Sequence, residues 1–559
     1  MDGVCNAFSR FFSNTELLGA TISDRQRAEG SIMNRISLAS AAVLLAAPAA
    51  IAQSGLRGLK PLPPPDGGVT PAQQAVIDAK LAEYEAAFGP ISHGGPRAAP
   101  PKLTFFPSAG TLYADLWLGN FVDLDPNAGA VDFRCGDLAG DGHLGHDAGP
   151  PWFGEQIVGV PIFAALDGVV TVALDGEDDM NTNGAPTPGN LVFIDHGDGF
   201  TTSYWHMKKN SVLVNVGDPV VAGQQIGQQG SSGNSFGPHV HFELDQNGVI
   251  YEPFTGACNP GASGWTTQPT IPTAHYAWDF GFWHDDLGLN PWWPNTWPRE
   301  GQIAITDDFM EFWLLGNLLP ANTNWRVRFQ RPDGVITFDS GVVPWGNPDA
   351  YGWYLTWWRY YLVDIPDIQT TPGTWRVLID VDGVTAVDAP VEMRPARTSG
   401  FNRAPEPVTA AIEPNQPKTG DVLVCRVSAN GVVDDRDYDI VRYRYLWRVN
   451  GAVARDVTSA ARSDALPRTA AAACGVVTCD VTPGDGLLDA ATVVASVVVA
   501  PACRSDFDGD GAADLTDLAI LLANFDATSA AHADGDTDCD GDVDLTDLAT
   551  LLSDFEQPC

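Results

Sequence analysis

Basic side chains are scarce in this sequence of 559 residues. Lysine and arginine together number 31, against 70 aspartates and glutamates, so the formal net charge is −39 at pH 7. A polyanion of this size is repelled by the phosphates of nucleic acids and by anionic lipid headgroups. We therefore exclude nucleic acid and anionic membrane surfaces as partners.

Long apolar runs are scarce too, and the one that stands out lies near the start. Residues 33–52, MNRISLASAAVLLAAPAAIA, carry an arginine near their beginning, an apolar centre and small residues at their end. This pattern is typical of a secretory signal peptide rather than of a membrane span. We expect translation to begin at Met33, residues 1–32 to be a mis-called extension, and the mature chain to begin near Gln53.

The lack of a second such run bears on where the protein works. No other apolar stretch approaches about 18 residues, so we expect no transmembrane segment. A signal peptide without a membrane anchor predicts a secreted or extracytoplasmic protein, in the periplasm, at the cell surface or outside the cell.

Cysteine is rare as well, with nine residues in the chain. Eight of them follow residue 52, and an even number in an oxidising compartment predicts disulfides. The candidate pairs are Cys135 with Cys258 and Cys425 with Cys479, because each pair brackets one expected domain. Spacing alone leaves the connectivity open.

The length and a hydrophobic content of 44% suffice for about three to five domains. Thr70, Pro71 and Gly89 occupy the preferred N-cap, first and C-terminal positions of a helix that follows a Pro/Gly-rich linker. Short strand-like runs dominate the rest, so the expected fold class is multidomain and mainly β. The expected divisions are a Pro-rich linker with a short helix (53–102), a β-rich block (103–262), a tryptophan-rich β domain (263–400), an immunoglobulin-like β-sandwich (401–502) and a small helical, acidic and repeated module (503–559).

Thirteen of the 17 tryptophans fall between residues 263 and 400. Exposed aromatic platforms would bind sugars by stacking, whereas Trp and Tyr at strand spacing pack more often into a sandwich core. We favour the core interpretation. The next domain shows Cys425, Trp447 and Cys479 in an order that resembles an immunoglobulin-like sandwich, and we expect it to be a spacer or adhesion module.

Histidine is limited to ten residues, and six of them lie between positions 143 and 241. His239 and His241 are two positions apart in the strand-like stretch FGPHVHFELD, so both imidazoles project from one face. His143 and Asp147 lie in GHLGHDAG, and His206 ends a predicted hairpin. Two imidazoles and one carboxylate around an open fourth position form the ligand set of a catalytic zinc ion. The set contains no thiolate, which argues against a closed structural zinc site, and no His-Glu-x-x-His helix occurs.

Three motifs of this block together closely resemble the lysostaphin/LytM-type zinc metallopeptidases, which cut peptide crosslinks in bacterial cell walls. The motifs are HLGHD at 143–147, YWH at 204–206 and GPHVHFE at 237–243, and the resemblance extends over residues 130–255. It implies an antiparallel β catalytic domain that holds one zinc ion. By the resemblance, three residues would bind zinc and two would act as catalytic residues beside the metal: His143, Asp147 and His241 in the first role, His206 and His239 in the second.

The resemblance implies a secreted zinc metalloendopeptidase that hydrolyses peptide bonds, most simply those of peptidoglycan crosslinks. Zinc lowers the pKa of a bound water to about 7, so a neutral imidazole can accept its proton as general base. Some relatives have lost zinc ligands and act as non-catalytic activators of wall amidases, but all five positions are intact here. A third interpretation makes the protein a cohesin-docking or glycan-binding surface component with a secondary peptidase.

Other polar residues of this block have plainer interpretations. His146 adjoins Asp147, so in an extended segment it should face away from the metal. His196 lies in the hairpin turn at 196–199 and is expected at the surface. An endopeptidase of this kind needs a groove that admits a peptide backbone. Five loop residues expected around it serve either as substrate contacts or only to shape the loops: Gly189, Asn190, Ser232, Gly233 and Asn234.

The last 57 residues contain one acidic loop twice, DFDGDGAADLTD at 506–517 and DTDCDGDVDLTD at 536–547. Each has acids at positions 1, 3, 5, 9 and 12 and glycine at 6, which suits the roughly six to eight oxygen ligands of Ca²⁺. Asp replaces the Glu that an EF-hand carries at position 12, and this with the two-loop spacing resembles dockerin modules, which dock on cohesin partners. The expected ligands of two Ca²⁺ ions are Asp506, Asp508, Asp510, Asp514, Asp517, Asp536, Asp538, Asp540, Asp544 and Asp547.

Overall fold

The computed structural model describes residues 54–61, 69–91, 100–288, 297–428 and 433–557. All of them belong to one structural unit, Gln53–Cys559. The expected extension at 1–32 and the expected signal peptide at 33–52 lie outside the described residues. The chain is mostly β-structure with few helices, as predicted. Across the described ranges, no helix is long and apolar enough to cross a membrane.

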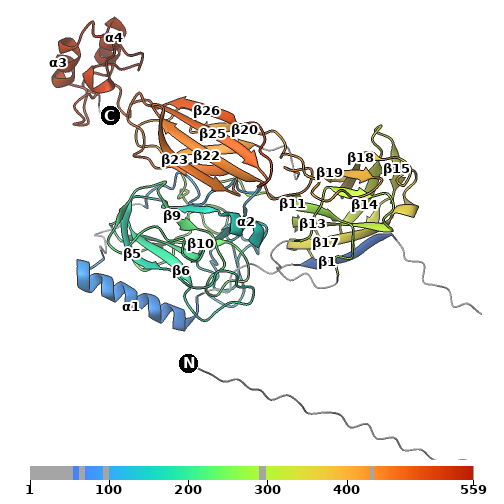
Figure 1. Cartoon of the computed structure of the whole chain (residues 1–559). Coiled ribbons are helices and arrows are strands. Elements are labelled where there is room, and N and C mark those ends of the chain that lie inside the picture. Colours follow the sequence, from blue (N-terminus) through green and yellow to red (C-terminus); the bar gives the residue numbers. More distant parts are fainter. Residues whose placement is uncertain (1–53, 62–68, 92–99, 289–296, 429–432, 558–559) are drawn as a thin grey trace, which may run out of the picture. The chain divides into compact units, whose positions relative to one another are not determined.

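A seven-stranded antiparallel sheet carries the histidine motifs, in the order β2-β3-β10-β7-β6-β5-β8 (Figure 1). Strands β6 and β7 form the predicted hairpin around residues 196–199. A two-stranded ribbon, β4-β9, and the short helix α2 (Phe153–Val158) complete this region. The strands are β2 (Trp117–Asn120), β3 (His146–Gly149), β4 (Pro161–Phe163), β5 (Gly168–Leu174), β6 (Asn190–Asp195), β7 (Phe200–Met207), β8 (Pro219–Val220), β9 (Gln225–Gln228) and β10 (Val240–Gln246).

Helix α1 (Pro71–Phe88) begins and ends where the sequence predicts. Thr70 is its N-cap, Pro71 its first residue and Gly89 its C-cap. On its inner side Ile77 is fully buried against side chains of β5, β6 and β7. The helix therefore covers one face of the histidine-bearing sheet (Figure 1).

The tryptophan-rich region forms two sheets, β1-β17-β13-β11 and β12-β19-β18-β14-β15, with β16 paired to β14. Trp325, Trp358 and Trp375 lie in their shared hydrophobic core, which supports the core interpretation for these side chains. The elements are β11 (Tyr276–Trp283), β12 (Gln302–Ala304), β13 (Phe309–Leu319), β14 (Asn324–Gln330), β15 (Ile336–Asp339), β16 (Val343–Pro344), β17 (Tyr351–Tyr361), the 3₁₀ turn η1 (Leu362–Asp364), β18 (Gly373–Val381) and β19 (Val384–Arg394).

The edge strand β1 (Gly55–Pro61) was not anticipated from the sequence. It pairs antiparallel with β17, about 300 residues further along the chain (Figure 1, blue beside yellow). A Cβ atom at Gly58 would lie 2.3 Å from the Trp357 ring, so glycine permits this close approach. The pairing joins the first described residues to the tryptophan-rich sandwich.

The next domain is a sandwich of the sheets β20-β21-β24 and β23-β22-β25-β26. Cys425 and Cys479 are buried in its core with Trp447, but both remain thiols, so the predicted bond between them is wrong for this structure. The two thiols hydrogen-bond and pack as small apolar groups instead. The strands are β20 (Thr409–Glu413), β21 (Leu423–Ser428), β22 (Arg442–Val449), β23 (Ala452–Ser459), β24 (Ser463–Leu466), β25 (Val476–Gly484) and β26 (Val493–Val498).

Two disulfides join described residues. Cys135 is bonded to Cys258, as predicted. Cys474 is bonded to Cys539, a pairing that the sequence did not suggest. Cys539 belongs to the second acidic loop, so this bond ties the C-terminal module to the preceding sandwich.

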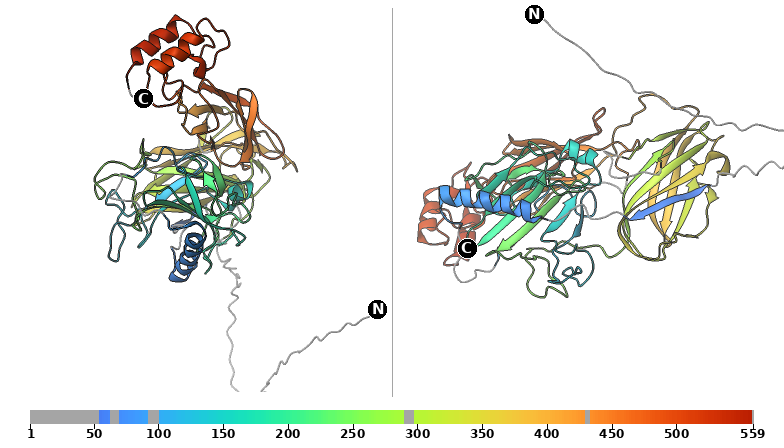
Figure 2. Two further views of the ribbon diagram at one scale, coloured as in Figure 1. Left: turned by 90° about the vertical axis from the view of Figure 1, so that its left-hand side faces the viewer. Right: turned by 90° about the horizontal axis from the view of Figure 1, so that it is seen from below.

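The C-terminal module consists of two helices, α3 (Leu515–Ala523) and α4 (Leu545–Asp554), with the 3₁₀ turn η2 (His532–Asp534) between them (Figure 2, red). Asp514 and Asp544 are their N-caps, and each side chain accepts a backbone hydrogen bond from the helix. The helices share a small core of Phe507, Leu521, Val543 and Leu551.

Charged side chains from four stretches of the chain, within 114–116, 150–160, 278–299 and 433–462, line a cavity of about 100 Å³. Burial raises the pKa of Glu155 to about 7, and burial also raises the pKa of Asp435 to about 7, with neighbouring aspartates adding to the effect. Glu155 Oε2 and Asp435 Oδ2 are buried without a hydrogen-bond partner among the described residues. The other charged residues that line the cavity are Asp115, Asp279, Arg299, Asp434, Asp439 and Arg462.

We predict that this cavity makes the folded state less stable as pH rises. A carboxyl of ordinary pKa, about 4, is already ionised in the unfolded chain at pH 5, whereas Glu155 and Asp435 still hold their protons in the folded one. The folded state thus binds more protons between about pH 4 and pH 7, so the free energy of unfolding falls across that window and levels off above it.

Urea unfolding midpoints at pH 5, 6, 7 and 8 measure this effect. The double variant Glu155→Gln, Asp435→Asn should show a flatter decline than wild type, while Asp349→Asn, at an exposed position, should not. A decline that is equally steep in the double variant would contradict the assignment.

Candidate metal centre

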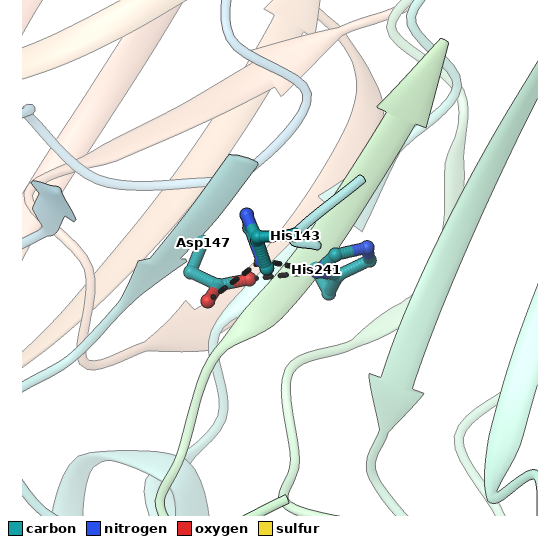
Figure 3. A group of neighbouring side chains, drawn as sticks. All are labelled: His143, Asp147 and His241. Carbon is teal, nitrogen blue, oxygen red and sulfur yellow. Dashed lines mark hydrogen bonds and ion pairs between the residues drawn. The ribbon is translucent and has the colours of Figure 1, made fainter. Parts of the chain in front are cut away.

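Three adjoining segments bring His143, Asp147 and His241 together (Figure 3). Asp147 on β3 and His241 on β10 are directly opposite in the antiparallel register, and His143 precedes β3 by three residues. His143 Nε2 lies 3.0 Å from His241 Nδ1 and 3.2 Å from Asp147 Oδ2, while His241 Nδ1 lies 2.9 Å from Asp147 Oδ1. All three side chains are buried.

Hydrogen bonds on the outer sides of the two imidazoles determine which nitrogen carries a proton. The Nδ1–H of His143 donates to the Phe121 carbonyl at 2.8 Å, so its Nε2 is a lone pair. In the tautomer that ligation of a metal through Nδ1 requires, the Nε2–H of His241 donates to the Glu243 carboxylate at 3.0 Å and Nδ1 directs a lone pair toward Asp147 Oδ1, 2.9 Å away. Two lone pairs and a carboxylate therefore converge on one point and repel one another unless a cation lies between them.

The spacing of these atoms fits a small divalent metal. Bonds of about 2.0–2.1 Å in tetrahedral geometry place neighbouring ligand atoms roughly 3.3 Å apart. The three separations in the structure, 2.9, 3.0 and 3.2 Å, are close to that value. Nitrogen and oxygen donors of this kind suit zinc.

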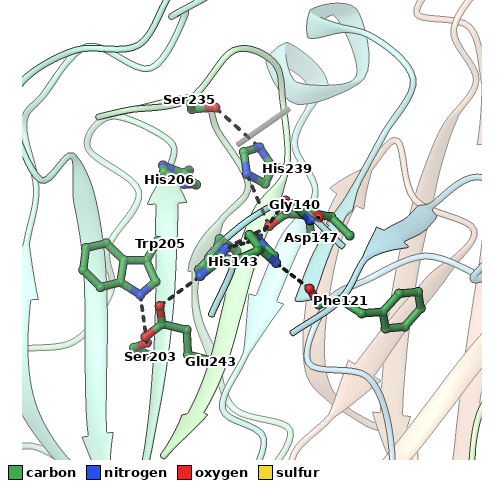
Figure 4. Close-up of polar contacts among 12 residues, drawn as sticks. Phe121, Gly140, His143, Asp147, Ser203, Trp205, His206, Ser235, His239 and Glu243 are labelled. Atoms are coloured by element: carbon green, nitrogen blue, oxygen red, sulfur yellow. Dashed lines mark hydrogen bonds and ion pairs between the residues drawn. The ribbon is translucent and has the colours of Figure 1, made fainter. Parts of the chain in front are cut away.

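Glu243, Ser203 and Trp205 form a chain of hydrogen bonds beside the ligand group (Figure 4). Glu243 accepts from His241 and, through its other oxygen, from the Ser203 hydroxyl at 2.9 Å. Trp205 Nε1 donates to that hydroxyl at 2.8 Å. Such outer partners orient a ligating imidazole and raise its basicity.

Two of these supporting residues were missed by the sequence analysis. Glu243 lies two positions after His241, so strand alternation places both on one face, and that signal was available. Asn120 donates from Nδ2 to Asp147 Oδ2 at 2.7 Å and accepts from the Gly140 N–H at 2.8 Å. It precedes Asp147 by 27 residues, and no sequence pattern links the two.

His206 and His239 lie beside the ligand group and not within it (Figure 4). Each has its Nδ1–H held by a backbone carbonyl, Ser232 O at 2.7 Å and Gly237 O at 2.9 Å respectively. Their ring centroids are 4.6 Å apart, and His239 Nε2 is 3.7 Å from Asp147 Oδ1. With Nδ1 protonated, the Nε2 of each ring is basic and can accept a proton.

The remaining polar residues of this region have structural roles. His146 faces away from the metal ligands, as expected, and contacts the Glu252 carboxylate at 3.0 Å. His196 lies in the hairpin turn, but its ring is half-buried rather than at the surface, with Nδ1 2.6 Å from the Asp167 carbonyl, and burial lowers its pKa. Asn190 is buried and donates to two backbone carbonyls, while Ser232 accepts from its N–H, which favours loop shaping over substrate contact.

The structure gathers part of each expected calcium ligand set. Asp506, Asp508 and Asp517 form one group in the first loop, without Asp510 and Asp514. In the second loop the acids form two groups, one of Asp536, Asp538 and Asp540 and one of Asp542, Asp544 and Asp547. Asp542, at position 7, was not predicted.

Comparison with known proteins gives a family for part of the chain. Residues 153–253 match the family described as Peptidase family M23. This span contains His206, His239 and His241, whereas His143 and Asp147 precede it.

The relatives named next are similar over a short part of the chain. The peptidoglycan DD-endopeptidase ShyA of Vibrio cholerae is 39% identical over 87 residues, 16% of this chain and 18% of that protein. Lysostaphin of Staphylococcus simulans is 36% identical over 91 residues, 15% of this chain and 18% of that protein. The solved catalytic domain of lysostaphin from the same organism aligns with 24% of this chain and 88% of its own at 25% identity, with a TM-score of 0.17.

The matched stretch thus spans less than a fifth of the length of these two relatives. Within the family match, residues 153–253, lie three of the five histidine and aspartate positions that converge in the structure. The chain therefore contains a peptidase M23 domain, homologous to that of proteins named peptidoglycan DD-endopeptidase and lysostaphin.

Proposed function

We propose that this protein is a secreted zinc endopeptidase that hydrolyses peptide bonds in peptidoglycan crosslinks. The observation that carries the proposal is the convergence of two imidazole lone pairs and one carboxylate, each oriented by an outer hydrogen bond. The names of its M23 relatives support the substrate class. The two disulfides agree with an oxidising compartment outside the cytoplasm.

His143, Asp147 and His241 would hold the zinc ion. When bound, zinc polarises a carbonyl and lowers the pKa of a water molecule to about 7. His239 and His206 supply the proton transfers, because the Nε2 of each can accept a proton while Nδ1 stays bonded to a backbone carbonyl. A carboxylate oxygen of Asp147, 3.7 Å from His239 Nε2, stabilises the positive charge that this ring then carries.

The imidazole that accepts the proton has a second role in the proposed reaction. Attack by the water passes one proton to the Nε2 of one imidazole. That protonated ring donates a hydrogen bond to the negative charge that develops on the carbonyl oxygen and then returns the proton to the departing amine, while the other ring stays neutral. The rival role as a non-catalytic amidase activator requires none of these five side chains. Their assembly in one buried group favours catalysis.

We also propose that the C-terminal module binds two Ca²⁺ ions and docks on a cohesin-like partner. Burial and neighbouring aspartates raise the pKa of Asp538, a sign of like-charge repulsion that a cation would relieve. Asp506 and Asp536 each accept hydrogen bonds from backbone N–H groups of their own loop. These bonds curve the loop backbone around the first acid of each loop. The proposed ligands are Asp506, Asp508, Asp510, Asp514, Asp517, Asp536, Asp538, Asp540, Asp544 and Asp547.

The first prediction separates metal ligand from base. His241→Ala should lose zinc and activity together, whereas His239→Ala should keep zinc and lose about 10²–10⁴-fold in turnover, since it removes only a proton carrier. Zinc content by elemental analysis and mass spectrometry of the muropeptides released from peptidoglycan measure the two properties.

His532→Ala, in the C-terminal module, is the matched control and should change neither property. Loss of zinc from a folded His239→Ala would show that its role is misassigned. A zinc-loaded wild-type protein that releases no muropeptide but stimulates an amidase would replace the proposed activity with the activator role.

A second prediction concerns Glu243. Glu243→Ala should weaken zinc affinity about 10–100-fold, because His241 loses the carboxylate that holds its ring and tautomer. Glu243→Gln should recover part of this loss, since its amide oxygen can still accept from His241. Competition with a chromogenic chelator measures the affinities. Glu177→Ala, at an exposed position, serves as control, and an unchanged affinity in Glu243→Ala would refute the role.

A third prediction concerns calcium. A calcium-selective chelator should increase amide hydrogen exchange across residues 503–559, because the repelling acids lose their counter-ion and the module has only a small core. Exchange in the histidine-bearing sheet and hydrolysis of a soluble peptide should stay unchanged. Full protection of the module after chelation, or loss of hydrolysis with zinc retained, would contradict the proposal.

A further inference from the structure

A pocket of about 190 Å³ lies where β2 and the loop that follows it meet the sheet β1-β17-β13-β11. Aromatic rings and amide side chains line it, and Asp137 is the one charged residue among the described residues of its wall. The aromatic and amide side chains of the wall are Tyr113, Trp117, Asn120, Tyr276, Asn317 and Trp353.

Three of these residues form a row across neighbouring strands. Asn317 on β13 is directly opposite Tyr276 on β11 and Trp353 on β17. Residues opposite one another on adjacent strands project from the same face, so the Asn317 amide lies between two aromatic side chains on the pocket side.

The histidine-bearing domain supplies the facing aromatic rings. Trp117 stacks on Trp353 with centroids 5.2 Å apart and planes at 17°. Tyr113 meets Tyr276 edge to face at 6.1 Å. The pocket is therefore framed by rings from both sides, and a flat apolar ring face can pack against them.

Asn317 itself lacks hydrogen-bond partners. It is 1% exposed, and within the described residues neither its amide nitrogen nor its amide oxygen makes a hydrogen bond. The Tyr113 hydroxyl is likewise buried without a partner in the described part of the chain. Buried polar groups are normally paired, so these atoms call for a ligand group that has both a donor and an acceptor.

The pocket is directly connected to the metal centre. Asn120 lines it, and the same amide donates to Asp147 Oδ2 at 2.7 Å and accepts from the Gly140 N–H at 2.8 Å. Leu138 also lines it, and the chain reaches the metal ligand His143 five residues later. A group bound in the pocket therefore touches Asn120, which positions one of the three proposed ligands, Asp147.

We propose that this pocket binds an N-acetylated amino sugar of the glycan strand whose crosslink is cut at the metal centre, an inference that rests on the proposed function. The acetamido group carries one N–H and one carbonyl, which match the amide of Asn317. The sugar ring face packs on the aromatic frame. The volume is below the roughly 300–1,000 Å³ of drug-sized ligand sites, which suits one sugar residue.

The charge of the wall favours a sugar over a stem peptide. A stem peptide carries carboxylates, and the residues that line the pocket include no lysine or arginine to pair with them. Asp137 would repel such groups but can accept hydrogen bonds from sugar hydroxyls.

The test is calorimetric binding of the N-acetylglucosamine trimer to the full-length protein. The trimer should bind, and the glucose trimer, which lacks acetamido groups, should bind at least tenfold more weakly. Gly352→Leu should weaken binding of the N-acetylglucosamine trimer at least tenfold, because the leucine side chain fills the pocket. A Cβ atom at Gly352 meets only Leu138 Cδ2, at 3.9 Å, so the backbone accommodates the change, and Gly352→Ala is the matched control with less than a twofold effect.

Asn317→Ala is an independent variant, and its affinity for the N-acetylglucosamine trimer should also fall at least tenfold. Asn127→Ala, which removes an exposed amide, should leave that affinity unchanged. Equal binding of the two trimers, no binding, or binding that both pocket variants leave unchanged would overturn the proposal. A sugar-free stem peptide whose affinity falls in Gly352→Leu would replace it with a peptide subsite. This assay measures binding without turnover. Its result therefore tests the sugar pocket even if the protein proves not to hydrolyse peptidoglycan.

Discussion

The lone pairs of His143 and His241 face the same carboxylate because each ring donates a hydrogen bond on its far side. This constraint organises the histidine-bearing domain. It depends on the register of β3 and β10, which places His241 opposite Asp147. A shift of one residue would turn His241 to the other face of the sheet and separate the donors. The antiparallel sheet and its buried core are therefore what hold the ligand atoms about 3 Å apart.

Tryptophan joins this domain to the sandwich that follows. Trp117 and Trp152 share one buried cluster with Trp297, Trp313 and Trp353. The aromatic side chains that could have formed an exposed sugar platform are instead largely packed away, and they frame a pocket beside Asn120. The tryptophan-rich sandwich thus contributes residues to the surroundings of the metal centre.

In the acidic module, two aspartates serve both as loop acids and as helix caps. Asp514 and Asp544 occupy position 9 of the loops and also cap the helices α3 and α4. A carboxylate at a helix N-terminus is stabilised by the free N–H groups there, so the loops keep a defined shape even though their acids repel one another. The Cys474–Cys539 disulfide limits how far the second loop can move from the sandwich.

Sequence alone was sufficient wherever the determining contacts are local. The helix at 71–88, with Thr70 and Gly89 at its ends, follows from capping and from the restricted backbone of proline. The hairpin that ends at His206 follows from alternation and turn residues. The five site positions came from motif resemblance, and the structure brings their side chains close together.

Tertiary structure decided everything that depends on partners distant in the chain. Asn120 contacts Asp147, β1 pairs with β17, and Cys474 bonds to Cys539, and none of these pairs leaves a periodic signal in the sequence. Cys425 and Cys479 show the reverse, because their order predicts a disulfide whereas the packed sandwich keeps both as thiols. Local patterns determine which elements form, but only the packing of the whole chain determines which side chains meet.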